Sequence, residues 1–160
     1  MPRRKSVNFK RDIGKDLRFD SELVQKFINV IMERGKKNVA RRIMYDALDI
    51  VIKRNSGDQA KGLNVFFTAF ERVVPTIEVR PRRVGGSVYQ IPVKVHQDRA
   101  EALALRWLVK AAATRNDETM GKRLAKELQE AVEGRGNAVK KKVDVHKMAE
   151  ANRAFSHFAW

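Results

Sequence analysis

The sequence predicts a mainly α-helical single domain from which a two-stranded β-hairpin protrudes between the third and fourth helices. About six stretches place apolar side chains at the i, i+3, i+4 spacing of an amphipathic helix. Only residues 73–93 instead alternate apolar and polar side chains, as two half-buried strands do. Because a lone two-stranded ribbon is marginally stable in water, the base of this hairpin must rest on the helices.

Length and composition agree with one globular domain. At 160 residues, the chain is long enough to bury about two-thirds of its unfolded surface. Its hydrophobic content of 43% excludes wholesale disorder. We divide the chain into a basic N-terminal arm, residues 1–19, and a helical domain, residues 20–160, which carries the hairpin arm at 73–93.

The charge indicates the kind of partner. A net charge of +15 is tolerated most easily beside an anionic partner, and nucleic acid and anionic membrane are the abundant candidates. No apolar run approaches the roughly 20 residues that span a bilayer, and the N-terminus has no apolar signal segment. The chain has no cysteine, so it has no disulfides and no thiolate metal site. We expect a cytoplasmic protein that binds a polyanion.

The first two helices follow the basic arm. Asp20 or Ser21 caps the first, and Gly35 is expected to end it as the residue just past its C-terminus. Lys36 and Lys37 follow, where cations favour the negative end of a helix and could also contact a phosphate. The second helix, capped by Asn38, carries apolar residues from 43 to 51.

The third helix, capped by Asp58, places three phenylalanines at helical spacing. Phe66, Phe67 and Phe70 could form a platform on which bases stack, or they could belong to the core. We assign them to the core, together with Leu63, because the i, i+3, i+4 period is that of a buried helix face.

The hairpin reverses at Gly85 and Gly86, which tolerate positive φ angles. Its predicted tip is strongly basic. Pro75 and Pro92 lack an N–H group, which suits strand ends or a sheet edge. The arginines of this tip are Arg80, Arg82 and Arg83.

Three further helices follow the hairpin. A capping box, Asp98 to Glu101, opens the fourth, and the fifth runs from Met120 to Gly134 after a break at 114–117. Asn137 is expected to cap a sixth helix that reaches Phe155. The aromatic residues at its end could bind a partner or pack back on the body, and their spacing does not decide between the two.

No pattern in the sequence supports catalysis. The three histidines are far apart and form no metal-binding spacing, and no glycine-rich loop could hold a nucleotide phosphate. The carboxylates are scattered over helical faces near Lys or Arg. We therefore expect neither an enzyme nor a small-molecule substrate, cofactor or metal.

The basic patches are the best functional candidates. The N-terminal arm is either a solvated tail or a segment that becomes ordered on phosphate, and we favour the second because neutralised phosphates release counterions. RNA is preferred over DNA because no helix-turn-helix or zipper pattern is present. The predicted RNA-binding cations are Arg3, Arg4, Lys5, Lys10, Arg11, Lys36, Lys37, Arg80, Arg82, Arg83, Arg115, Lys122, Arg123, Lys140, Lys141 and Lys142.

Several motifs resemble those of the small-subunit ribosomal protein seven family, of the bacterial or organellar type. The resemblance covers residues 20–160 almost without gaps. The motifs are Ser21-x-Leu23-x-x-x-Phe27-Ile28, Gly35-Lys36-Lys37, Ile43-Met44-x-x-Ala47, Glu78-Val79-x-x-Arg82-Arg83-Val84-Gly85-Gly86-x-x-Tyr89-Gln90-Ile91-Pro92-Val93, Ala102-Leu103-Ala104-x-Arg106-Trp107-Leu108 and Asn152-Arg153-Ala154-Phe155.

This resemblance implies a structural protein that binds the 3′ major domain of 16S rRNA early and nucleates assembly of the head of the small subunit. It implies a hairpin directed toward the exit-site tRNA, with small-subunit proteins nine and eleven as neighbours. It adds Gly85, Gly86, Tyr89, Asn116 and Met120 to the RNA-facing residues, and it makes Phe155, Phe158 and Trp160 candidates for the contact with protein eleven.

Two other function classes remain as alternatives. A protein-interaction adaptor would use its basic faces to bind acidic partners. A membrane-surface protein would need one helix with an apolar face and a strongly cationic face, whereas the cations here are spread over loops and tips. A steep salt dependence of RNA binding would distinguish an RNA-binding protein from a protein-interaction adaptor.

Overall fold

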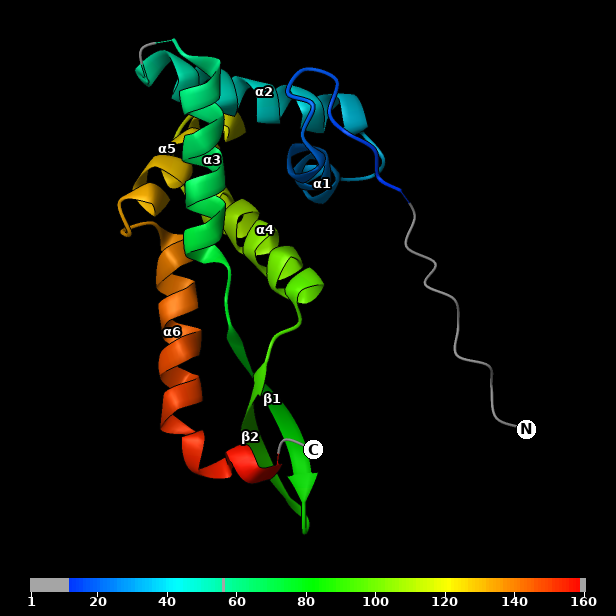
Figure 1. The fold of residues 1–160 in the computed structure, drawn as a ribbon, viewed down its shortest axis with the longest axis vertical. Coiled ribbons are helices and arrows are strands. Elements are labelled where there is room, and N and C mark those ends of the chain that lie inside the picture. Colours follow the sequence, from blue (N-terminus) through cyan, green and yellow to red (C-terminus); the bar gives the residue numbers. More distant parts are fainter. Residues whose placement is uncertain (1–11, 56, 159–160) are drawn as a thin grey trace, which may run out of the picture.

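The computed structural model describes residues 12–55 and 57–158, and it confirms the mainly helical fold with a hairpin between the third and fourth helices (Figure 1). A helical body lies at one end, and the hairpin extends from it beside the last long helix. The elements in chain order are α1 (Glu22–Ile31), α2 (Lys37–Arg54), α3 (Gln59–Val73), β1 (Ile77–Val84), β2 (Ser87–Lys94), α4 (Gln97–Ala113), α5 (Met120–Val132), α6 (Asn137–Ala151) and the 3₁₀ segment η1 (Arg153–Phe158).

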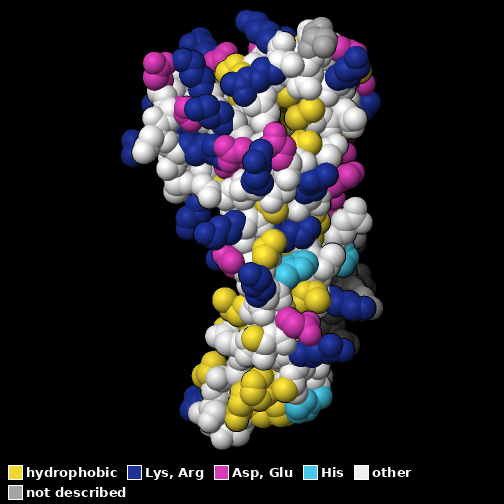
Figure 2. Space-filling view, turned by 90° about the vertical axis from the view of Figure 1, so that its left-hand side faces the viewer, with side chains coloured by type: hydrophobic (Ala, Val, Ile, Leu, Met, Phe, Trp, Pro, Cys, Tyr) yellow, Lys and Arg dark blue, Asp and Glu magenta, His cyan; other side chains and the backbone are white. Residues whose placement is uncertain are grey.

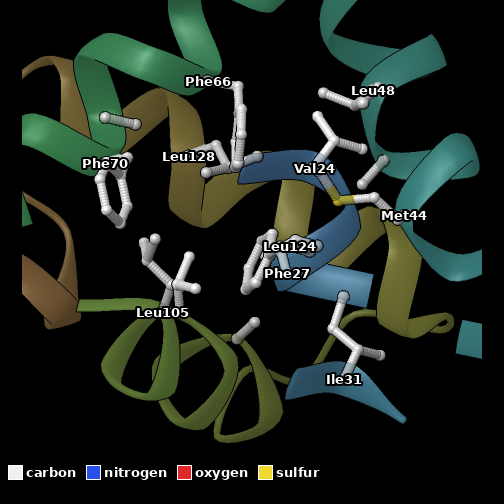
Figure 3. Packing of buried hydrophobic residues seen from close by; sticks show 14 of the residues in the cluster. Val24, Phe27, Ile31, Met44, Leu48, Phe66, Phe70, Leu105, Leu124 and Leu128 are labelled. Carbon is white, nitrogen blue, oxygen red and sulfur yellow. The ribbon is translucent and has the colours of Figure 1, made fainter. Parts of the chain in front are cut away.

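The core of the body forms around α5, which packs against α2, α3 and α4. Figure 3 shows Phe27 of α1 beside Leu124 of α5, with Phe66 of α3 beside Leu128. All four side chains are fully buried, and the rings of Phe27 and Phe66 stack with their centroids 5.7 Å apart. Burial of each such side chain stabilises the fold by roughly 1.5–3 kcal/mol. The core assignment is confirmed for Phe66 and Phe70, which are buried, while Leu63 and Phe67 are partly buried and pack against the core.

Two predicted helix caps are present. The Ser21 hydroxyl accepts a hydrogen bond from the Val24 amide, and the Asp58 carboxylate accepts from the amides of Ala60 and Lys61. Each cap satisfies amide donors that have no partner inside the first turn of a helix.

The boundary between the first two helices differs from the prediction. The first helix, α1, ends at Ile31 rather than near Gly35, because Met32 is extended and both Arg34 and Gly35 take positive φ angles in a turn. The second helix, α2, begins at Lys37 with Lys36 as its N-cap, so the predicted Asn38 cap is wrong.

Three predicted features in the second half are also wrong. His96 is the N-cap of α4, so Asp98 lies inside its first turn instead of capping it. Gly136, not Asn137, is the N-cap of α6. The last helix stops at Ala151 rather than reaching Phe155, because the Asn152 side chain donates to the carbonyl of the preceding turn and the chain continues as η1.

The two strands of the hairpin pair in a regular antiparallel register that closes with Val84 opposite Ser87. Gly85 and Gly86 form the two-residue turn with φ angles of +55° and +90°, as in a type I′ turn whose twist matches the strands. Counting from the closing pair, Pro81 and Pro92 fall at positions whose N–H groups point away from the partner strand. Both prolines therefore fit within the strands without the loss of a ladder hydrogen bond.

The C-terminal part of the chain supports the hairpin. α6 contacts β1, and η1 contacts β2, so the arm is braced along its length (Figure 1). At its base, the Thr76 amide donates to Nε2 of His146 on α6, 3.3 Å away. Further along, Tyr89 packs against Phe155 and Phe158 with ring centroids 5.0 and 6.0 Å apart. Within the described parts of the chain, no helix is long and apolar enough to cross a bilayer.

Candidate nucleic-acid interface

The predicted basic arm is described only from residue 12 onward, and there it packs on α2. The buried Asp16 carboxylate accepts hydrogen bonds from the Phe19 amide and the Tyr45 hydroxyl. The Arg18 guanidinium bonds to Asp49 on α2 and lies 5.0 Å from the centroid of the Phe19 ring. The arm cations that lie outside the described residues are Arg3, Arg4, Lys5, Lys10 and Arg11.

Lys36 and Lys37 lie exposed at the first turn of α2. Neither forms an ion pair with any residue that the structure describes. The N-terminus of a helix carries a partial positive charge and unpaired amides. The charges of two lysines there are repelled by this partial charge, so a bound anion would stabilise the start of the helix. The sequence suggested that these two lysines follow the C-terminus of a helix. They lie instead at the N-terminus of α2, where binding of a phosphate is more favourable.

Sequence reasoning missed two further cations beside this turn. Arg34 is exposed within it, and Arg41 lies one helical turn after Lys37. The Nε atom of Arg41 is buried and has no hydrogen-bond partner among the described residues. The i, i+4 spacing of Lys37 and Arg41 was the available signal, since such residues share a helix face.

Arg80 lies in the middle of β1 rather than at the tip of the hairpin, opposite Ile91. Its guanidinium pairs with Glu78, whose carboxylate is nearly buried. The Nε atom of Arg99 on α4 also donates to both Glu78 oxygens, at 2.8 and 2.9 Å. This cluster ties β1 to α4, so the Arg80 charge is partly neutralised inside the protein.

The other two hairpin arginines lie on opposite faces of the ribbon. Arg82 is the cross-strand partner of Tyr89, so both point to the face that carries the aromatic contacts. Arg83 pairs with the exposed Val88 on the other face, next to the Gly85–Gly86 turn. Arg83 is exposed and forms no ion pair within the described structure.

Arg115 follows α4 and is largely internal, with 13% of its side chain exposed. Its Nε donates to the fully buried Glu127 at 2.8 Å, and a terminal nitrogen donates to Glu130 at 2.9 Å. These carboxylates raise the pKa of Arg115, and the guanidinium lowers the pKa of Glu130. The other Glu127 oxygen accepts from the Ala138 amide at 2.8 Å, so one carboxylate holds Arg115 and the start of α6 together.

The remaining predicted residues of this region lie around the same turn. Asn116 is exposed, and Met120 is half-buried against the core at the start of α5. Lys122 is exposed and pairs with Glu118. The half-buried Arg123 donates through Nε to a backbone carbonyl at 2.6 Å. The turn therefore presents its cations in fixed positions.

The three lysines of α6 differ in their surroundings. Lys140 and Lys141 are exposed and have no ion pair within the part of the chain that the structure describes. Lys142 is half-buried and donates to the Arg72 carbonyl at 2.8 Å, and burial lowers its pKa.

A small groove of about 380 Å³ lies between α4 and α6 next to Lys141. Arg106 and Lys110 of α4 add two cations to its lining, and the partly buried Trp107 lies between them in the sequence. The sequence reading treated α4 only as a core helix and missed both cations. Figure 2 shows Lys and Arg side chains spread over the helical body, with hydrophobic side chains gathered at the hairpin end.

The terminal aromatic residues pack back on the hairpin, which was one of the two alternatives. Phe155 and Phe158 contact Tyr89, so the predicted RNA-facing tyrosine and two predicted protein-contact residues form one cluster. Trp160 lies outside the described residues. A role of this cluster in binding a partner stays a prediction.

Residues 2–153 match the family model described as ribosomal protein S7p/S5e. The chain belongs to this family. It is 52% identical to the small ribosomal subunit protein uS7 of Idiomarina loihiensis and 49% identical to that of Wigglesworthia glossinidia brevipalpis, each over the full length of both chains. The uS7 protein of Bartonella tribocorum is 54% identical over 94% of this chain and 95% of its own.

Family membership confirms the resemblance drawn from the motifs. RNA binding and a part in translation follow from it, and the chain is a structural component rather than an enzyme.

Proposed function

We propose that the chain is a component of the small ribosomal subunit in the cytoplasm. It binds the 3′ major domain of 16S rRNA as a primary binding protein and nucleates assembly of the subunit head. The observation that carries this proposal is the full-length similarity, at 52% and 49% identity, to proteins named for the small subunit.

The proposed rRNA contacts are cations whose charge no internal ion pair offsets. Phosphate neutralises such groups without the cost of breaking an existing pair. The set comprises Lys36, Lys37, Arg83, Lys140 and Lys141. Arg34, Arg41, Arg106 and Lys110 extend it, and the N-terminal cations Arg3, Arg4, Lys5, Lys10 and Arg11 belong to it by charge.

The α4–α5 turn contributes to the same interface mainly by its shape. Arg115 holds the turn against α5 and α6, so it acts as a positioning residue. Lys142 has a similar role beside α3. The side chains that the turn presents to RNA are Asn116, Met120, Lys122 and Arg123.

The hairpin is proposed to reach the exit-site tRNA at the subunit interface. Gly85 and Gly86 allow close approach of a backbone at its tip, and Arg83 adds a charge there. Arg80 and Arg82 lie further down the ribbon on the other face. Small-subunit proteins nine and eleven are the proposed protein neighbours, with Phe155, Phe158 and Trp160 near protein eleven.

Filter binding to isolated rRNA fragments tests the proposal. The purified protein is titrated with a 3′-domain fragment and with a 5′-domain fragment of equal length, over a series of salt concentrations. We expect a preference for the 3′ fragment that survives moderate salt, since shape-specific contacts add to counterion release. Equal binding of both fragments, lost together as salt rises, would reduce the protein to a generic polycation.

A further inference from the structure

The groove of about 380 Å³ lies where the second half of α4 passes the start of α6, and we call it the α4–α6 groove. Three cations line it, Arg106 and Lys110 from α4 and Lys141 from α6. Arg106 and Lys110 are one helical turn apart, so they share the face of α4 that borders the groove. Among the described residues that line the groove there is no carboxylate, so its charge is positive throughout.

The three cations of the groove have no partner inside the protein. Each is exposed, and none forms an ion pair or a side-chain hydrogen bond within the part of the chain that the structure describes. Asp144, the carboxylate three residues after Lys141 on α6, is exposed and forms no ion pair with that lysine. An anion in the groove would therefore be attracted by all three cations without breaking an internal pair.

Trp107 gives the same groove an aromatic surface. One part of the indole packs against the core, and the rest lines the groove. Ala111, one turn further along α4, has a small buried side chain and leaves space beside the ring. Within the described structure the indole N–H has no hydrogen-bond partner, and only Arg41 holds a buried side-chain donor without one, so the indole N–H is open to solvent. A phosphate requires the cations alone, whereas this groove places an aromatic ring beside them.

We propose that the α4–α6 groove binds a single unpaired nucleotide of RNA, with its phosphate beside the three cations and its base against Trp107. The bases of an RNA duplex are stacked inside the helix and cannot reach an aromatic ring in a groove, so the base must be unpaired. The volume of about 380 Å³ is near the lower end of small-molecule sites, which suits one nucleotide. An acidic peptide would match the cations, but a planar base uses the aromatic ring as well.

This inference rests on the proposed function, because the nucleotide would belong to the rRNA, and it adds the kind of RNA structure that this surface binds. Exposed cations elsewhere on the molecule can be neutralised by the phosphates of a duplex. The α4–α6 groove would instead select a bulge, a loop or a strand end, where unstacked bases are available.

The fluorescence of Trp107 tests the base contact directly. The full chain carries Trp160→Phe, so that Trp107 is its only tryptophan, and it is titrated with a short oligoadenylate. A base that stacks on the indole should quench the emission along a saturable curve. An RNA hairpin, an abasic ribose-phosphate chain and an oligoglutamate, each matched in charge, are compared with it. None of the three should quench, and the abasic chain should bind about tenfold more weakly than oligoadenylate.

Two substitutions of Trp107 test the aromatic ring, with binding followed by the anisotropy of a labelled oligonucleotide. Trp107→Leu keeps an apolar side chain against the core and should remove most of the difference in affinity between oligoadenylate and the abasic chain. Trp107→Tyr should retain most of that difference, because tyrosine also stacks on bases. Thermal unfolding verifies that both variants are folded.

A charge variant leaves the packing of Trp107 in place, so it tests the groove even if Trp107→Leu does not fold. Lys110→Gln, Lys141→Gln should weaken oligoadenylate binding about tenfold. The matched control is Lys61→Gln, Lys126→Gln, which removes two lysines that already pair with carboxylates outside the groove. It should weaken binding by less than about twofold.

Several results would overturn the proposal. Saturable binding of oligoadenylate without quenching of Trp107 would place the base elsewhere. Equal affinity for the abasic chain would reduce the groove to a phosphate site, and tighter binding of oligoglutamate would make it a site for acidic proteins. Equal losses in the charge variant and its control would remove the role of the groove.

The 3′ rRNA fragment separates this inference from the proposed function. If the Trp160→Phe protein prefers that fragment but its Trp107 emission is not quenched, the proposed function stands and the nucleotide site is rejected. If oligoadenylate quenches Trp107 and the 3′ fragment is not preferred, the nucleotide site stands and the proposed function is rejected.

Discussion

At the scale of single residues, Glu127 connects more of the molecule than any pattern in the sequence suggested. One oxygen accepts from Arg115 after α4, and the other accepts from the Ala138 amide in the first turn of α6. The Gly136 backbone leaves room for this contact, since a Cβ atom there would lie 2.7 Å from a Glu127 oxygen. A carboxylate from α5 therefore caps a different helix.

Replacement of Glu127 by alanine should lower the free energy of unfolding by about 3 kcal/mol, because it leaves a mostly buried guanidinium and an uncapped helix. Glu127→Gln keeps an oxygen for the Ala138 amide and should cost roughly half as much. Urea denaturation measures both. As a control, Glu133→Ala removes an exposed partner of Arg135 and should change stability by less than about 0.5 kcal/mol. Equal losses for Glu127→Ala and Glu133→Ala would contradict this role.

His146 gives the base of the hairpin a pH dependence. Its Nε2 accepts from the Thr76 amide only when that nitrogen is unprotonated. Burial, and then the nearby Lys142 charge, lower the pKa of His146 below 6.5. The folded state therefore binds fewer protons than the unfolded state as pH falls through this range, so the protein loses stability there.

The melting temperature of the wild type should accordingly fall between about pH 7.5 and about pH 5.5 by more than that of His146→Gln. Glutamine does not titrate, and its side-chain oxygen can still accept from the Thr76 amide. Differential scanning calorimetry of both proteins at the two pH values measures the difference. An identical fall in the two proteins would show that His146 does not contribute to the pH dependence.

At the scale of elements, the hairpin is a braced arm whose arginines have different roles. Arg80 pairs with the nearly buried Glu78, which also binds Arg99 of α4. Arg83 lies exposed near the turn on the opposite face. The first therefore contributes to the attachment of the hairpin, and the second is available to a partner.

Arg80→Ala should lower the free energy of unfolding by about 1 kcal/mol, since half of this side chain is solvated and Arg99 still pairs with Glu78. Arg83→Ala should change it by less than about 0.5 kcal/mol. In binding to tRNA, the order should be reversed, with the larger loss for Arg83→Ala. Thermal unfolding and tRNA filter binding of the two variants test both halves. Weaker tRNA binding by Arg80→Ala alone, with Arg83→Ala unchanged, would contradict the roles assigned to these two arginines.

The existence and type of every main element were predictable from sequence, because apolar periodicity reports which face of a helix or strand is buried. The α3 phenylalanines and the Gly85–Gly86 turn are examples. The ends of a helix were less predictable where a residue distant in the sequence caps the helix. The Glu127 carboxylate that caps α6 lies eleven residues before the Ala138 amide that donates to it, and nothing local in the sequence marks the pair.

The candidate site was predictable in charge but not in arrangement. Basic runs identified Lys36, Lys37, Lys140 and Lys141. Which cations are neutralised inside the protein depends on pairs between elements, such as Arg115 with Glu127. Those pairs form only when the helices pack, so the sequence does not show which arginines are paired and which are not.

At the scale of the whole molecule, the charges are divided among distinct surfaces. Among the described residues, cations without internal pairs lie on α2, on the hairpin tip, on α4 and on α6, whereas Arg115 is paired inside the protein. We infer that the cations without internal pairs bind RNA. Net charge alone does not express this division.

The salt dependence of binding to the 3′ rRNA fragment tests this account most directly. Lys36 and Lys37 are replaced by alanine in one protein, and the exposed but ion-paired Lys61 and Lys126 in a control with the same change in charge. The account predicts that the slope of log K against log salt flattens by about 1.4 to 1.8 for the first protein, as expected for two lost phosphate contacts, and by less than about 0.5 for the control. Equal flattening in both proteins would mean that only net charge matters, and it would contradict the assignment of unpaired cations to the RNA interface.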